Sequence, residues 1–169
     1  MSSSESLTNT EQSLSRTSFY ILLAGILANT IGQSFIFAIL PPLGREVALT
    51  EVQTTSIISA SALLFTFCSP WWGRQSDRIG RKIVIVIGLT GYAAGTLVFA
   101  GVFALGMSGV LSGTVLYITL MLARCSQSSL MAATSPGVTA YAADHTSRAL
   151  RTRTLARLGT ANSLGFIIG

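Results

Sequence analysis

Ten residues between two apolar runs hold the densest group of charges in the chain. The stretch GRQSDRIGRK, residues 73–82, contains four Lys or Arg, one Asp and two Gly, although only 10% of the 169 residues are charged. A carboxylate beside arginines can form charge-assisted hydrogen bonds, and a glycine lets two helices approach closely. We predict a structured, ion-paired segment; the simpler alternative is a solvated cationic loop.

A second candidate group lies inside an apolar run. Arg124 and Gln127 fall on one face of a predicted helix. An arginine inside a bilayer costs about 2.5 to 3.5 kcal/mol on insertion scales, so it should face a protein interior or a wet cavity. The alternative is that Arg124 extends to the outer interface, because little helix precedes it.

Further polar residues stand where they could join these groups. Asn29 and Gln33 are four apart in the first apolar run and would form one stripe of a helix. They could line a cavity or make hydrogen bonds between helices. Asp144 could pair with Arg81, cap the end of its own helix, or pair with Arg148.

The elements that position these residues are long apolar segments. Half of the residues are hydrophobic and the mean hydropathy is +0.61, which is typical of membrane proteins. We predict an all-α, polytopic bundle of transmembrane helices that contacts the lipid bilayer, because about 20 apolar residues cross the membrane once. The predicted crossings are residues 19–40, 54–72, 83–105 and 114–142, with the start of a fifth from about 158. Pro41 and Pro42 should end the first, and Pro136 should kink the fourth.

The cations predict the orientation. Nine of the eleven Lys and Arg would lie on one side of the membrane and only Arg45 on the other, with Arg124 inside a crossing. The positive-inside rule then places the N-terminus and residues 73–82 in the cytoplasm. Residues 1–17, rich in Ser and Thr, are predicted to form a flexible cytoplasmic tail. The short basic clusters argue against a nucleic-acid partner, and the cysteine spacing argues against a metal site. We predict no cofactor.

Four stretches together resemble the major facilitator superfamily of transporters. Gly73, Asp77, Arg78, Gly80, Arg81 and Lys82 match its G-x-x-x-D-R-x-G-R-R/K loop pattern. Arg124 and Gln127 match its R-x-x-Q-G motif, with Ser128 in place of Gly, and Asp144 lies in a match to its Y-x-A-D-x-T ending. Gly165 and Gly169 resemble the glycines of the G-x-x-x-G-P core of drug/proton antiporters.

The resemblance implies a role for each group of residues. The loop pattern, with Asp144, would form a latch that stabilises one transporter conformation. Arg124 and Gln127 would serve proton coupling, Asn29 and Gln33 would line the substrate path, and Gly165 and Gly169 would pack against another helix.

The resulting hypothesis is a secondary active transporter, not an enzyme, that exports drugs or small metabolites in exchange for protons across the plasma membrane, here the bacterial inner membrane. The fold would be part of the N-terminal half of a major facilitator transporter, residues 18–169. We expect a truncated N-terminal fragment that needs the missing C-terminal helices, or another chain, to transport. The alternative function is a non-transporting membrane remnant or scaffold protein.

Overall fold

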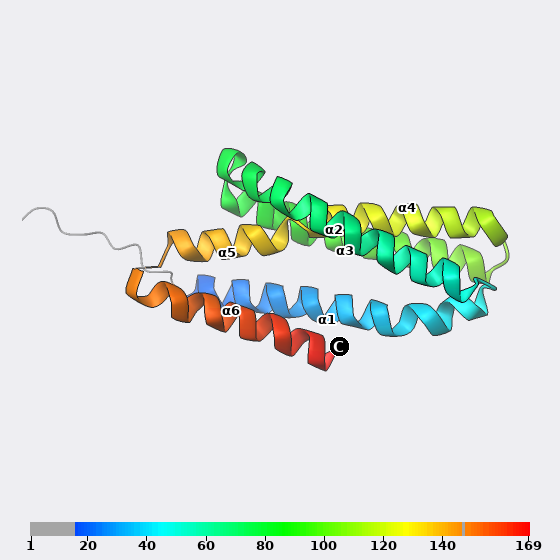
Figure 1. The fold of residues 1–169 in the computed structure, drawn as a ribbon, viewed down its shortest axis with the longest axis horizontal. Helices are drawn as coiled ribbons and strands as arrows, with labels where there is room; N and C mark the ends of the chain where they lie inside the picture. Colours follow the sequence, from blue (N-terminus) through cyan, green and yellow to red (C-terminus); the bar gives the residue numbers. More distant parts are fainter. Residues whose placement is uncertain (1–15, 147) are drawn as a thin grey trace, which may run out of the picture.

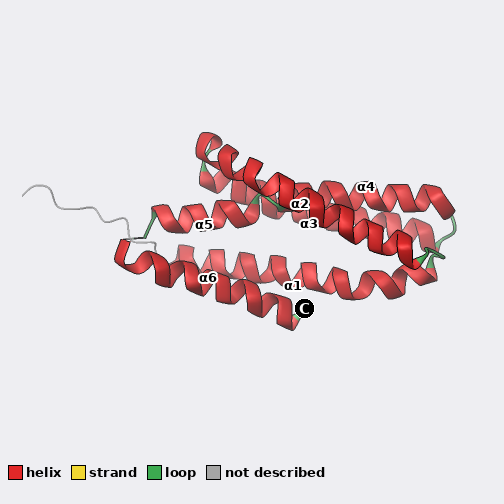
Figure 2. Ribbon diagram, viewed as in Figure 1, coloured by secondary structure: helices red, strands yellow, loops and turns green. Residues whose placement is uncertain are grey.

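The chain folds into a bundle of helices (Figures 1 and 2). The computed structural model describes residues 16–146 and 148–169, and within them every regular element is a helix. The elements are α1 (Arg16–Glu46), α2 (Glu51–Ile79), α3 (Arg81–Met107), α4 (Gly113–Met131), α5 (Thr134–Asp144) and α6 (Arg148–Ile168). The all-α prediction is therefore confirmed.

Successive helices run back and forth along the long axis, and α4 and α5 follow each other end to end (Figure 1). The start of α1, the α2–α3 junction and the α5–α6 connection share one end of the bundle. We call this the cationic end, because the helix segments that meet there carry Arg74, Arg78, Arg81, Lys82, Arg151 and Arg153. The α1–α2 connection at the opposite end carries Arg45.

Two apolar clusters hold the bundle together. The cluster toward the cationic end contains Leu22, Ile26, Ile85, Val138, Ala142 and Leu158, contributed by α1, α3, α5 and α6. The other contains Leu40, Ile57, Phe99, Phe103, Leu116 and Leu120, among others. Along α1 and α4, buried polar residues lie between the two clusters, so the bundle has a polar layer with an apolar core on either side.

Three helices, α1, α2 and α3, are long and apolar enough to cross a membrane. Each exposes large hydrophobic side chains on its outer face, such as Ile21, Phe67 and Leu97. A surface of this kind is stable in hydrocarbon, where apolar groups have no need of burial in protein. The chain is a multi-pass membrane protein.

Two predicted boundaries were wrong because helices continue through them. Pro41 and Pro42 lie inside α1, which runs on to Glu46. Proline is tolerated in membrane helices because neighbouring groups compensate for the missing backbone hydrogen bond. The predicted loop at residues 73–82 is almost entirely helical, because only Gly80 separates α2 from α3.

Two further boundaries differ from the prediction. The fourth crossing is divided at Ala132 and Ala133 into α4 and α5. Pro136 explains the break, because its ring would clash with the carbonyl of the residue four positions earlier. The fifth helix begins at Arg148 instead of near 158. Most of the predicted tail lies outside the described residues, and its last two residues, 16 and 17, already belong to α1.

Glycines set two of the closest helix contacts. A Cβ atom on Gly91 would lie 2.6 Å from Leu130 Cβ, and one on Gly95 would lie 2.7 Å from Gln127 Cβ, so α3 packs tightly on α4 there. On the other side, a Cβ on Gly165 of α6 would lie 2.7 Å from Thr30 Cβ of α1. Gly169 meets the backbone of Ile31 in the same interface.

Candidate functional site

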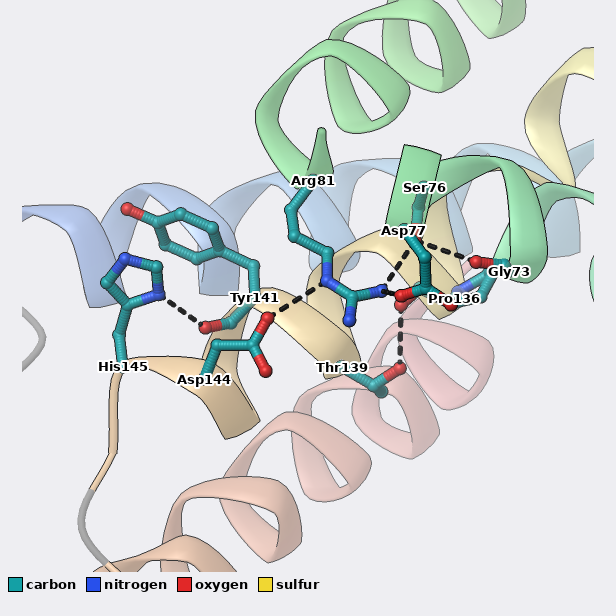
Figure 3. A network of polar contacts seen from close by, with 9 residues as sticks. All are labelled: Gly73, Ser76, Asp77, Arg81, Pro136, Thr139, Tyr141, Asp144 and His145. Carbon is teal, nitrogen blue, oxygen red and sulfur yellow. Dashed lines mark hydrogen bonds and ion pairs between the residues drawn. The ribbon is translucent and has the colours of Figure 1, made fainter. Parts of the chain in front are cut away.

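Arg81 is the centre of a charged cluster at the cationic end (Figure 3). Its Nη1 lies 2.6 Å from Asp77 Oδ1, and its Nε donates a hydrogen bond of 2.9 Å to Asp144 Oδ2. Asp77 stands near the end of α2 and Asp144 ends α5, so one guanidinium connects elements more than 60 residues apart. We call Asp77, Arg81 and Asp144 the clasp.

A buried serine completes the clasp. Arg81 Nη1 also donates 2.7 Å to Ser76 Oγ, which in turn donates 2.9 Å to the Gly73 carbonyl. The three charged side chains are partly exposed, whereas Ser76 is 1% exposed. Ser76 was missed in the sequence, because it occupies an unspecified position of the motif. Its contact with Arg81 depends on how α2 meets α3 at Gly80, so the sequence carried no signal for it.

The two glycines of the motif act differently. Gly80 has φ of +101°, a conformation that residues with a Cβ rarely adopt, and this allows α3 to begin directly after α2 ends. Gly73 is helical, and a Cβ there would lie 3.7 Å from Pro136 Cβ, an ordinary contact. Gly73 thus faces α5 as expected for helix packing, but it is not sterically required in this conformation.

The remaining cations of the motif lie around the clasp. Lys82 Nζ lies 6.0 Å from the centre of the Tyr141 ring, which stacks on His145. Arg78 is exposed and forms no ion pair with a described residue. Lys82 therefore adds a weak contact to α5, and Arg78 contributes positive charge to the surface.

Arg124 lies in the polar layer and is fully buried. Its Nη1 donates 2.7 Å to Gln127 Oε1 and its Nη2 donates 3.0 Å to Gln33 Oε1 on α1. The guanidinium also faces the ring of Phe37, 5.7 Å from the centroid. Arg124 therefore points into the bundle and does not extend to the outer interface.

Gln127 extends this group to a third helix. Its Nε2 donates 2.6 Å to Thr96 Oγ1 on α3, so α1, α3 and α4 are joined by a chain of hydrogen bonds. We call Gln33, Thr96, Arg124 and Gln127 the amide network. Thr96 was missed in the sequence because a lone threonine in a membrane helix usually bonds its own backbone, as it also does here to Tyr92.

The amide network contains no counter-charge. The four described carboxylates, Glu46, Glu51, Asp77 and Asp144, all stand at or near helix ends. A buried cation without a carboxylate is unusual, because desolvation of the charge has to be offset by hydrogen bonds alone. Within the described residues no cluster of His, Cys, Asp and Glu could hold a metal ion.

A cavity of about 450 Å³ opens beside the amide network. Asn29, Thr30 and Gln33 of α1 line it together with Asn162 and Phe166 of α6 and residues of α2, α4 and α5. This size suits a small organic molecule. The structure thus brings both candidates for the substrate path, Asn29 and Gln33, to one cavity, and Gln33 also makes the interhelical hydrogen bond that was the alternative.

Comparison with known proteins covers nearly the whole chain. Residues 22–169 match the family model described as Major Facilitator Superfamily. The chain is 31% identical to Multidrug resistance protein 2 of Bacillus subtilis over 91% of its length, and 30% identical to Tetracycline resistance protein, class B, of Escherichia coli over 88%. It is 33% identical to a triacylglyceride transporter of Mycolicibacterium smegmatis, again over 88%.

The aligned regions are only part of these relatives. The chain spans 36%, 35% and 24% of their respective lengths. The family match includes the clasp, the amide network and the cavity, since all of their residues fall between 22 and 169. This 169-residue chain belongs to the major facilitator superfamily.

Proposed function

We propose that the chain forms the N-terminal part of a proton-coupled exporter of small amphipathic molecules in a bacterial plasma membrane. Family membership indicates transport. Export is favoured because relatives from Bacillus subtilis and Escherichia coli are named multidrug and tetracycline resistance proteins. The observation that carries the proposal is the clasp, an ion-paired connection between the α2–α3 junction and α5, together with a cavity of drug-like size that α5 also lines.

The clasp would act as a conformational latch. A transporter alternates between states by movement of helix bundles against each other, so contacts at one end of the bundle have to form in one state and break in the other. Ion pairs that are partly exposed contribute little to folding stability, about 0 to 1 kcal/mol each. The clasp could therefore open without unfolding the bundle.

Arg124 would contribute to coupling through its charge. An arginine does not release its proton in a protein, so the proton carrier must be a different group. The buried guanidinium would raise the cost of a second positive charge nearby and favour a negative one. Loading and release of a proton at an acidic group contributed by helices beyond those described would thereby depend on what occupies the cavity.

The chain would work with further helices, from the same polypeptide or from another. Alternating access in this family uses two bundles, whereas the described helices form one. We further propose that the cationic end faces the cytoplasm, with the N-terminus, because cationic segments are retained on that side. The 169-residue chain expressed by itself should insert and not transport.

The test uses the complete protein as its gene encodes it, in inverted membrane vesicles of a bacterium that lacks its main drug exporters. Respiration acidifies the vesicle interior, and a fluorescent dye reports the gradient. Chloramphenicol, tetracycline and tetraphenylphosphonium are added in turn. At least one of them should collapse part of the gradient, because exchange removes protons, and Asp77→Asn should insert normally and respond weakly. No response to any of the three at equal protein level would favour the non-transporting scaffold.

A further inference from the structure

The cavity beside α1 contains an amide without a partner. Asn29 lines the cavity, is 7% exposed, and its Nδ2 makes no hydrogen bond with any described residue. An unpaired buried donor is unfavourable, because it has lost its hydrogen bonds to water and gained none in return. A conformation that keeps such a donor beside an empty space of drug-like volume is explained if a bound molecule supplies the acceptor.

A second amide is oriented by Arg124. Gln33 lies one helical turn from Asn29 and also lines the cavity. Because Gln33 Oε1 accepts from Arg124 Nη2, the opposite end of the amide, the Nε2 donor, remains for other partners, and it has none among the described residues. Asn29 and Gln33 therefore offer hydrogen-bond donors on one face of α1.

The charges around the cavity also favour a ligand that presents an electron-rich group. Every described residue that lines it is uncharged, so this part of the wall provides no carboxylate to attract a cation. Arg124 donates a hydrogen bond to Gln33, which lines the cavity, and no described carboxylate pairs with Arg124. An uncompensated buried positive charge repels cations and attracts negative or electron-rich groups.

We propose that this cavity binds amphipathic molecules that present an oxygen acceptor, uncharged or anionic, to the amide donors of Asn29 and Gln33, and that it rejects cations. The apolar surface of the ligand would lie against Ile26, Leu155 and Phe166 of the same cavity. This inference deepens the proposed function by naming the substrate class. It makes Asn29 a specificity-determining residue.

The test measures binding without a proton gradient, so that it stands apart from transport. The complete protein, reconstituted in lipid nanodiscs, is titrated with radiolabelled chloramphenicol, an uncharged amide, and with radiolabelled tetraphenylphosphonium, a cation without an acceptor. Chloramphenicol should bind at least about tenfold more tightly, because one good hydrogen bond is worth up to that factor. Equal or tighter binding of the cation, or saturable binding of neither probe, would overturn the inference.

Three variants locate the effect. Asn29→Leu keeps the side-chain size and removes the amide, so it should weaken chloramphenicol binding about tenfold. Asn29→Asp places a carboxylate in the cavity and should reverse the preference toward tetraphenylphosphonium. Thr90→Val is the matched control, since Thr90 is exposed on α3 and bonds only its own helix. Unchanged chloramphenicol binding by folded Asn29→Leu would contradict the proposal.

The binding result and the transport result are separable. Selective binding of chloramphenicol without any gradient response would support the cavity chemistry and count against export. A gradient response to tetraphenylphosphonium that Asn29→Leu leaves intact would support export and overturn the substrate class.

Discussion

Arg81 and Arg124 join helices by opposite means. Arg81 has a side chain that is 26% exposed and is held by two carboxylates, Asp77 and Asp144. Arg124 is 0% exposed and is held by two amides and an aromatic ring. The charge is thus compensated where water can reach it and left uncompensated where water cannot.

The difference separates two uses of the same side chain. Exposed ion pairs are weak and are screened by salt, which suits a contact that has to break and re-form. A buried guanidinium keeps its full field, because little solvent screens it, and its amide partners fix its position without neutralising it. The clasp therefore has the weak, exposed contacts that the proposed latch requires, whereas the contacts of the amide network hold a charge in a fixed position.

The largest expected effect comes from removal of the buried charge. Arg124→Met keeps an elongated side chain in the polar layer, and replacement of a buried ion by an apolar group is often neutral for stability. We expect transport to fall to background, while the free energy of unfolding changes by no more than about 2 kcal/mol, the cost of leaving the two glutamines less well paired. Gradient-driven uptake and thermal unfolding measure the two.

Arg124→Lys is the companion variant for that measurement. It keeps the charge, but a single ammonium group lacks the fork that reaches Gln33 and Gln127 together. Partial transport by this variant would assign the effect to charge. Transport by Arg124→Met at the wild-type rate would end the distinction between the two arginines.

A smaller effect is expected when the clasp loses the partner that belongs to another helix. Asp144→Asn removes the ion pair between Arg81 and α5. Since a pair of this exposure is worth up to about 1 kcal/mol, the transport rate should fall about fivefold and the protein should remain folded. Arg45→Gln, at the opposite end, should change nothing, because its pair with Glu51 is long, 3.8 Å, and highly exposed.

A double variant sharpens that result. If Asp144 acts through Arg81, Arg81→Gln combined with Asp144→Asn should reduce transport no more than Arg81→Gln does by itself. Additive losses would mean that Asp144 acts through some other partner, and the clasp would then not be one unit.

The smallest expected effect is on stability and tests how tightly the helices pack in the two regions. Gly95→Ala would press against Gln127 at 2.7 Å and should lower the free energy of unfolding by about 1 to 3 kcal/mol. Gly73→Ala has room beside Pro136 and should raise it by up to about 1 kcal/mol, because alanine favours a helix interior. Thermal unfolding of the two variants in one detergent checks the sign. Equal shifts would show that the region around the amide network is no tighter than the clasp.

Much of the architecture follows from the sequence, because apolar runs of membrane length leave few alternatives to a helix. The exact ends did not follow. Pro41 and Pro42 are strong breakers in water, but a helix in a bilayer has no solvent to receive its free backbone groups and so continues to Glu46. Residues 74–79 were assigned to a loop because three of them are charged. A helix can nevertheless extend beyond the hydrocarbon, and α2 does so.

The site was partly predictable. The spacing of Asp77 and Arg81 and the position of Asp144 suggested the contacts of the clasp, whereas its role as a latch stays a prediction. Thr96 and Ser76 could not be identified, because their partners depend on how α3 lies against α4 and how α2 bends into α3. Nor does sequence periodicity reveal that Asn29 lacks a partner, since that requires knowing every neighbour.

The junction at Gly80 has a mechanical consequence. A loop of several residues would let one helix move without moving the next. Here a single residue joins two helices of 29 and 27 residues. A pull on Arg81 from α5 must therefore turn the whole of α3 about one joint. Because α3 is one continuous helix that reaches the far end of the bundle, it would move as a rigid lever. A shift of a few ångströms at Arg81 would then also displace Thr96 in the interior of the bundle.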